Sequence, residues 1–186
     1  MALLPVVKYG DPILRKKVDE VSDFSELDNL INDMFETMYN ERGIGLAANQ
    51  VGVSLAILVF DISHYEIDEN TDNEESFEPN PRIFINPKII DSVGECSMEE
   101  GCLSVPEIRA NILRPETITL QYYDLNKNKC SEVFSGLAAR VILHEIDHLN
   151  GKFFTDYLST SKRMLIHKRL QEIAVNGSPS TGIILP

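Results

Sequence analysis

Residues 144–148 read His-Glu-Ile-Asp-His, and this segment constrains the fold more than any other. The surrounding residues 136–151 are apolar at helical intervals, so a helix is predicted there. Residues four apart share one face of a helix, so His144 and His148 can offer imidazole nitrogens to one ion. Glu145 lies about 100° further round the helix axis, where it can reach a water on the metal more easily than the metal itself. The fold is therefore expected to place a helix beside a metal site.

This pattern is typical of two metal-binding histidines with the glutamate as general base. The alternative is a surface helix whose histidines are satisfied by other groups. Only four histidines occur in the chain, and two of them stand here. A buried histidine pair without a metal would need other hydrogen-bond partners. A catalytic metal also needs a third protein ligand and an open position.

The third ligand is expected upstream of the histidine pair. The downstream candidates are His167, Asp156 and Glu172, and none continues the longer metzincin pattern. Upstream, Cys102 stands in a Glu-Gly-Cys-Leu-Ser segment, and a thiolate with two imidazoles suits zinc or ferrous iron. A lone cysteine is more often a small buried hydrophobe, but the histidine pair favours a ligand here.

The composition excludes several classes of function. The formal charge of −12 disfavours general nucleic-acid binding. No apolar run approaches the roughly 18 residues that span a bilayer, so no membrane partner is expected. The first 17 residues lack the features of a signal peptide. The three cysteines are irregularly spaced, which favours a reducing compartment. We expect a bacterial cytoplasmic protein.

The hydrophobic pattern predicts an α+β fold: antiparallel strands and hairpins packed around a central metal-binding helix, with a C-terminal helix. Ser25 is expected to cap the first helix. The predicted elements are a helix over 25–40, a strand over 55–61, a strand near residue 83, a hairpin from 117–123 that turns at 126–129, a helix over 136–151 and a helix over 159–174.

The length of 186 residues and the 43% hydrophobic content suit one compact domain. We expect a single catalytic domain over 1–175 and a flexible tail over 176–186. The polar, acidic residues 62–81 are expected to form an exposed insertion between strands.

Three segments together resemble peptide deformylases: Gly-Ile-Gly-Leu-Ala-Ala-Asn-Gln at 43–50, Glu-Glu-Gly-Cys-Leu-Ser at 99–104 and His-Glu-Ile-Asp-His-Leu-Asn-Gly at 144–151. The resemblance runs from Gly-Asp-Pro-Ile-Leu-Arg-Lys-Lys near the N-terminus to the C-terminal helix. It implies a metal-dependent hydrolase that removes the formyl group from N-formyl-methionyl nascent peptides.

The resemblance also implies roles for individual residues. Cys102, His144 and His148 would hold one divalent metal. Ferrous iron (Fe²⁺) is favoured, and Zn²⁺, Ni²⁺ and Co²⁺ are alternatives in purified protein. Glu145 would be the general acid and base. Gln50 and the backbone N–H of Leu103 would donate hydrogen bonds to the formyl oxygen, as an oxyanion requires.

The remaining implied residues form a substrate pocket and its support. Glu100 and Arg114 are expected to form a charged pair behind the ligands. The sequence departs from the family at Leu143, Asn49 and Arg140, and Arg140 is expected to alter the pocket edge. The pocket would be lined by Gly43, Ile44, Gly45, Gly101, Arg109, Leu137 and Val141.

Two other functions fit the same motifs. A metallopeptidase would share the histidine chemistry but cleave internal peptide bonds, and the upstream cysteine argues against it. An inactive relative would bind peptide or ribosome without turnover, and the intact Glu145 and Gln50 argue against that. The helix over 159–174 carries a basic face, which either contacts the ribosome or is simply solvated.

Overall fold

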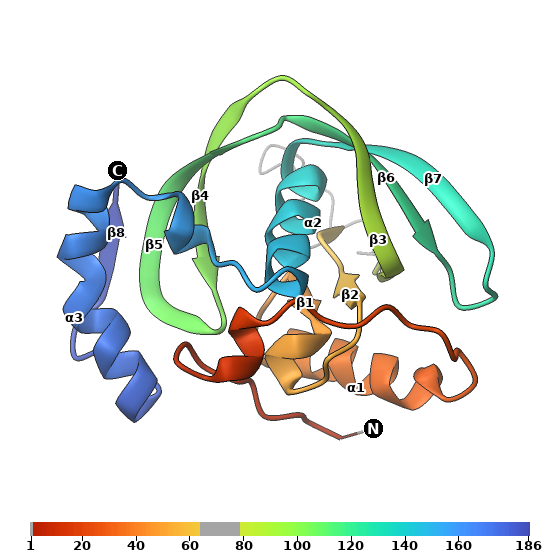
Figure 1. Ribbon diagram of the computed structural model, residues 1–186, viewed down its shortest axis with the longest axis horizontal. Helices are drawn as coiled ribbons and strands as arrows, with labels where there is room; N and C mark the ends of the chain where they lie inside the picture. Colours follow the sequence, from red (N-terminus) through yellow and green to blue (C-terminus); the bar gives the residue numbers. More distant parts are fainter. Residues whose placement is uncertain (1, 64–78) are drawn as a thin grey trace, which may run out of the picture.

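The computed structural model describes residues 2–63 and 79–186 (Figure 1). Most of the acidic insertion expected over 62–81 lies outside these residues. Within the described ranges, no helix combines the length and the apolar character needed to cross a membrane.

The secondary structure follows the α+β pattern predicted from the sequence. The predicted strands, hairpin and helices all occur, with their ends shifted by a few residues. The elements are η1 (Pro12–Arg15), α1 (Leu27–Asn40), β1 (Gly45–Ala47), η2 (Ala48–Val51), β2 (Ile57–Phe60), β3 (Arg82–Val93), β4 (Cys96–Cys102), β5 (Val105–Arg114), β6 (Thr117–Tyr123), β7 (Lys129–Ser135), α2 (Gly136–Leu149), η4 (Phe154–Tyr157), α3 (Thr160–Asn176) and β8 (Ile183–Leu185).

Two sheets surround α2, which stands at the centre of the molecule (Figure 1). The larger sheet has the strand order β1-β2-β3-β6-β7 and is antiparallel throughout. The smaller sheet has the order β4-β5-β8. Among residues 2–63 and 79–186, β1 and β4 are therefore both edge strands, and each leaves one side of its backbone unpaired within its sheet.

The helix α2 is buried over most of its surface. Every residue from Ala139 to Glu145 is buried, which is typical of a helix enclosed on several sides. Its Ile142 packs in one apolar cluster with Phe84 and Leu120 of the larger sheet. Because packing fixes α2 so tightly, the polar side chains on it have well-defined positions.

The start of α1 differs from the sequence prediction. The helix begins at Leu27, and Glu26 occupies the N-cap without a side-chain hydrogen bond. Ser25, predicted as the cap, instead donates its backbone N–H to Asp23 Oδ1 at 2.9 Å. The cap prediction was wrong because this local aspartate turn competes for the same backbone.

The C-terminal residues also differ from the flexible tail expected over 176–186. Ile183–Leu185 form β8, which pairs in parallel with β5 at Ile108–Ala110. Leu185 is buried in the same apolar cluster as Ile166 and Leu170 of α3. The unpaired edge of β5 and this apolar cluster supply the partners that a short tail needs to become ordered.

Gly151 ends α2 as the sequence predicts. Its φ of +72° is a left-handed conformation, and a Cβ there would lie 2.6 Å from the carbonyl oxygen of Arg15. Gly177, after α3, has a similar φ of +80° but no atom within 4 Å of a Cβ. Substitutions at these two glycines therefore distinguish the effect of backbone strain, present at both, from the effect of close packing, present only at Gly151.

We expect Gly151→Ala to lower the free energy of unfolding by roughly 2–5 kcal/mol, from left-handed strain and overpacking together. Gly177→Ala should lower it by roughly 1–2 kcal/mol, from strain alone. Urea denaturation of the metal-loaded protein measures both. Equal losses at the two positions would contradict the importance of the contact with Arg15.

Candidate metal centre and substrate cleft

Three possible metal ligands come together in the structure, as the sequence predicts. The donor atoms of Cys102, His144 and His148 all lie within 4.8 Å of one another. His144 and His148 lie one turn apart on α2, and Cys102 is the last residue of β4. The Cys102 Sγ atom is 3.1 Å from His148 Nε2. One thiolate and two imidazoles form a donor set that suits zinc or ferrous iron.

The two imidazole rings are held in different ways. His144 Nδ1 bonds to Glu100 Oε2 at 2.8 Å, which leaves Nε2 as the possible ligand atom. Its ring also stacks on Phe154, with ring centroids 6.0 Å apart. The ring of His148 stands edge-on to Phe153, with centroids 5.4 Å apart. The Glu100 carboxylate therefore orients the ring of His144, and packing against Phe153 orients the ring of His148.

The buried surroundings shift the pKa values of the two histidines in opposite directions. Burial lowers the pKa of His148 well below its usual value, so its imidazole is neutral and able to bind a metal. Burial also acts to lower the pKa of His144, but hydrogen bonds to Cys102 and Glu100 raise it well above its usual value. The negative groups around His144 therefore favour a cation at this position, which is a property a metal site requires.

Glu100 is the centre of a buried charged cluster behind the histidines. Its Oε1 accepts hydrogen bonds from Arg114 Nε at 2.6 Å and Arg140 at 2.7 Å. Its Oε2 accepts from His144 and, at 3.0 Å, from Arg114. Burial acts to raise the pKa of Glu100, but hydrogen bonds from His144 and Arg114 hold it well below its ordinary value. Arg114 also bonds Asp147 Oδ2 at 2.6 Å, so two guanidinium groups balance two carboxylates.

Arg140 and Asp147 were not predicted as members of this cluster. Arg140 lines the cavity beside the candidate ligands, but its guanidinium turns inward and also donates to the carbonyl oxygens of Ile112 and Cys96. It therefore supports Glu100 more than it shapes the pocket edge. A signal was present in the sequence: a charged residue four positions before His144 lies on the same buried face of the helix and needs a partner.

Glu145 lies beside the ligands with one oxygen free. Its side chain is buried, and among the described residues its Oε2 has no hydrogen-bond partner. Burial raises the pKa of Glu145 to about 7. A nearby divalent cation would favour its ionised form. A buried carboxylate with an unpaired oxygen can accept a proton from a water molecule and return it.

Gly45 makes room for this carboxylate. A Cβ at Gly45 would lie 2.6 Å from Val141 Cγ1 and 2.8 Å from Glu145 Oε1. From the sequence, Gly45 is expected as part of the pocket lining. The structure shows that a glycine is also needed here because it lets β1 pass so close to α2.

A hydrogen bond to the side-chain carbonyl oxygen of Gln50 fixes the orientation of its amide group. The backbone N–H of Ala47 donates to Gln50 Oε1 at 2.8 Å, so the amide Nε2 points the other way. That Nε2 lies 3.7 Å from Cys102 Sγ and 3.3 Å from Ser104 Oγ. A fixed amide donor beside the ligand set is able to bind the oxygen of a polarised carbonyl.

Asn49 and Leu143, two of the departures from the family pattern, are both buried. Asn49 Nδ2 donates to the backbone carbonyl of His148 at 2.6 Å, so it helps fix the end of α2. Leu143 belongs to the apolar cluster of the larger sheet. Neither side chain belongs to the candidate ligand set.

A cavity of about 460 Å³ lies beside these groups. Glu100, Gln50, Leu103 and Glu145 line it together with Cys102 and His144, whereas His148 and Arg114 lie behind its wall. All seven residues predicted for the substrate pocket line it as well: Gly43, Ile44, Gly45, Gly101, Arg109, Leu137 and Val141.

Comparison with known proteins agrees with this arrangement. The family model described as polypeptide deformylase matches residues 3–164. The peptide deformylase of Christiangramia forsetii is 45% identical over 92% of this chain and 90% of its own length. That of Tolumonas auensis is 44% identical over 95% of this chain and 99% of its own.

Solved structures show the same similarity. The crystal structure of a peptide deformylase from Legionella pneumophila matches with a TM-score of 0.80 and 40% identity, over 92% of this chain and 95% of that chain. The Ehrlichia chaffeensis peptide deformylase in complex with actinonin matches with a TM-score of 0.80 and 40% identity, over 92% and 98%. The chain therefore belongs to the peptide deformylase family, metal-dependent hydrolases that remove the N-formyl group from nascent peptides.

Proposed function

We propose that this chain removes the formyl group from formyl-methionyl peptides in the cavity between β1, β4 and α2. The observation that carries the proposal is the grouping of Cys102, His144 and His148 beside Glu145, whose Oε2 has no hydrogen-bond partner in the described part of the chain. An activated water and a base to manage its proton are the two requirements for hydrolysis of an amide.

The ligand set would hold one divalent cation, and we propose Fe²⁺, with Zn²⁺, Ni²⁺ and Co²⁺ as substitutes in purified protein. The cation would supply Lewis acidity, which makes a water nucleophilic at neutral pH and polarises the formyl carbonyl. A thiolate ligand favours iron and zinc over harder cations such as Mg²⁺.

The reacting groups of the chain have separate roles. Glu145 takes a proton from the water whose oxygen attacks the formyl carbon. Gln50 Nε2 and the Leu103 N–H donate hydrogen bonds to the carbonyl oxygen as its negative charge grows. The C–N bond then breaks, Glu145 delivers the proton to the departing amine, and formate leaves.

The methionine side chain would enter the apolar part of the cavity. Ile44, Leu137 and Val141 line it, and an unbranched thioether adapts well to such a wall. The edge strands β1 and β4 flank the cavity, so an extended peptide can pair with a free strand edge. Arg109 lies at the exposed rim, where it pairs with Glu99 at 3.3 Å.

We further propose a bacterial cytoplasmic location, a single catalytic domain that includes β8, and contact with the ribosome through α3. The relatives named above from sequence comparison are bacterial. On α3, Arg163, His167 and Lys168 are exposed, and they form a positive face on an acidic protein. Arg169 and Lys168 have partners of their own. Arg169 Nε donates to the Thr181 carbonyl at 2.9 Å, and Lys168 Nζ lies 3.9 Å from Glu172 Oε1.

The first test is anaerobic turnover of formyl-Met-Ala-Ser with metal analysis of the same sample. We expect formate release in proportion to bound metal, with iron as the metal of protein purified without air. The unformylated peptide should remain intact. Cleavage of internal peptide bonds would indicate a metallopeptidase, and full metal occupancy without formate release would indicate an inactive relative.

Glu145→Ala should keep the metal and lower kcat by about 10²–10⁴-fold, because general acid–base catalysis contributes about that much. Cys102→Ser should instead lower the metal content, since it replaces the thiolate ligand. Formate release and metal stoichiometry separate the two effects. Near-normal turnover by Glu145→Ala would assign the base to another group.

The ribosome contact is tested by reversing the charge of two exposed residues, Arg163→Glu and Lys168→Glu together. We expect weaker co-sedimentation with ribosomes at low salt and unchanged turnover of a short peptide, because the altered face lies outside the cavity lining. Lys17→Glu and Lys152→Glu together, at two other exposed lysines, form the matched control with the same change of net charge. Equal ribosome binding by both variants would show that this face of α3 does not contact the ribosome.

A further inference from the structure

The N-terminal segment Val7–Tyr9 reaches both of the groups proposed to bind the formyl oxygen. We propose that Lys8 is a positioning residue for the reaction, whose ammonium group holds the turn after β4 so that the Leu103 N–H is aimed at the formyl oxygen. This inference rests on the role of Leu103 in the proposed function.

The turn that carries Leu103 needs support from outside. Only Leu103 and Ser104 separate β4 from β5, because Cys102 already pairs with Val105. Two-residue hairpin turns favour Gly, Asn or Asp with positive φ, since that geometry matches the twist of the strands. Neither Leu103 nor Ser104 has a positive φ, and the pairing shifts register between Glu100 and Cys102. The strand pairing alone therefore specifies this turn weakly.

The N-terminal segment supplies that support. Lys8 Nζ donates to the carbonyl oxygen of Leu103 at 2.9 Å. The N–H of Tyr9 donates to the carbonyl oxygen of Ser104 at 2.8 Å, so both carbonyl groups of the turn have partners. The N–H of Val7 donates to the carbonyl oxygen of Gln50, also at 2.8 Å. Three consecutive residues thus tie together the two segments that carry the proposed oxyanion donors.

Gln50 links the same two segments from inside the site. Its Nε2 lies 3.3 Å from Ser104 Oγ, and Ser104 is completely buried. The turn is therefore held on one side by Gln50 and on the other by Lys8 and Tyr9. A displacement of the turn would change the direction of the Leu103 N–H relative to the Gln50 amide.

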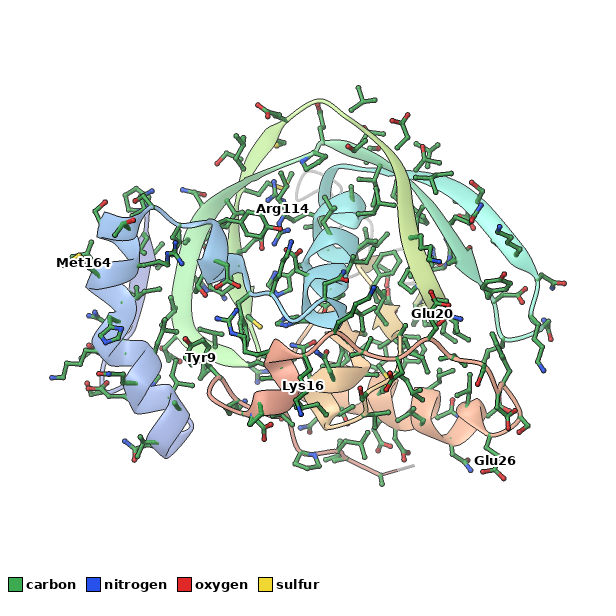
Figure 2. All side chains as sticks on the ribbon, in the orientation of Figure 1. Tyr9, Lys16, Glu20, Glu26, Arg114 and Met164 are labelled. Atoms are coloured by element: carbon green, nitrogen blue, oxygen red, sulfur yellow. The ribbon has the colours of Figure 1, made fainter. Side chains whose placement is uncertain are left out.

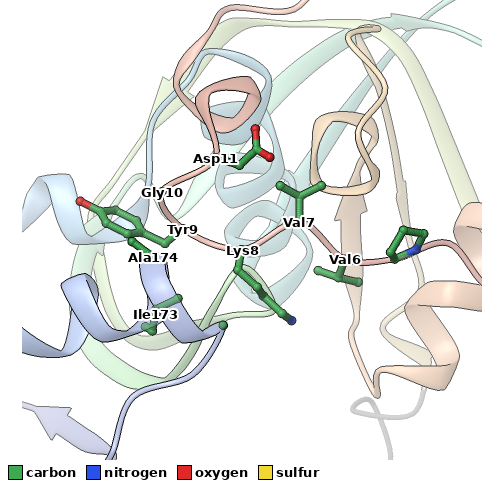
Figure 3. Close-up of a pocket in the computed structure, with 10 residues that line it drawn as sticks. Val6, Val7, Lys8, Tyr9, Gly10, Asp11, Ile173 and Ala174 are labelled. Carbon is green, nitrogen blue, oxygen red and sulfur yellow. The ribbon is translucent and has the colours of Figure 1, made fainter.

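Lys8 is the member of this segment whose side chain matters. The bonds from Val7 and Tyr9 come from the backbone, so any residue except proline could make them. The bond from Lys8 requires its ammonium group, and charged donors form shorter and stronger hydrogen bonds than neutral ones. Val7 and Lys8 leave the segment in opposite directions, as in an extended chain (Figure 3).

The surroundings of Lys8 make it suitable for substitution. The segment borders a cavity of about 390 Å³ lined by residues 5–11 with Ile173, Ala174 and Gly177 (Figure 3). Lys8 is half-buried and does not belong to any of the three apolar clusters of the described residues. Its replacement by a methionine of similar length should leave the fold and the metal ligands intact.

A positioning role predicts a specific kinetic effect. If the Leu103 N–H stabilises charge that develops only in the transition state, misdirecting it lowers kcat and leaves KM nearly unchanged. A purely structural role would instead lower the melting temperature or the metal content together with the activity.

The experiment compares Lys8→Met, Lys8→Arg and Gln50→Ala in the metal-loaded enzyme with formyl-Met-Ala-Ser. Lys16→Met is the matched control, because Lys16 is exposed and its side chain makes no hydrogen bond with the described residues. Figure 2 labels Lys16 among the side chains of the molecule. We expect Lys8→Met to lower kcat on the order of 10-fold, less than the ~10²–10³-fold expected of Gln50→Ala, which removes a donor outright. KM, melting temperature and metal content should stay unchanged, and Lys8→Arg should restore most of kcat.

A thioformyl peptide adds a second readout. Sulfur accepts hydrogen bonds weakly, so the ratio of wild-type to Lys8→Met kcat should shrink towards one with this substrate. An equal loss on both substrates would overturn the inference, and so would a loss that follows metal content or melting temperature.

The two proposals can fail separately. An unchanged kcat in Lys8→Met, with a large loss in Gln50→Ala, would overturn the role of Lys8 and leave the proposed oxyanion donors in place. An unchanged kcat in Gln50→Ala would overturn the proposed donors themselves and, with them, the inference about Lys8.

Discussion

The carboxylate of Glu100 is the interaction on which the other contacts of the site depend. It accepts four hydrogen bonds, two from Arg114 on β5 and one each from Arg140 and His144 on α2. A buried charge costs several kcal/mol unless it is fully partnered, so only one relative position of the sheet and the helix satisfies this group. Asp147 balances the remaining positive charge.

The positions of the reacting groups follow from that arrangement. Cys102 lies two residues after Glu100 on the same strand, so the contact that orients His144 also places the thiolate beside it. In the same cavity, Gly45 lets β1 approach Glu145 until a single methyl group would not fit. The candidate base and the two histidines are thus held on adjacent faces of one rigid helix, while Cys102 reaches them from β4.

Local patterns in the sequence predicted the parts of this site that a local pattern can encode. The histidine spacing, the end of α2 at Gly151 and the hairpin of β6 and β7 all follow from helix and turn geometry. Arg140 and Asp147 were missed because their partners lie on strands far away in the sequence. The cap at Ser25 failed because a competing aspartate turn is equally local. The contact of Lys8 with Leu103 joins residues 95 positions apart, and no periodic pattern in the sequence can reveal such a contact.

The free edges of β1 and β4 raise a separate question, because unpaired strand edges normally promote aggregation. Here β1 has only three residues, and the cavity beside it carries Glu41, Arg42 and Arg109 among its lining residues. Short edges and charged side chains are the devices that prevent pairing with another copy of the chain. Both edges border one cavity, so the fold keeps two rows of backbone groups accessible beside these charged side chains. An extended peptide end can enter where a second folded domain cannot, and this favours a substrate that is still unfolded.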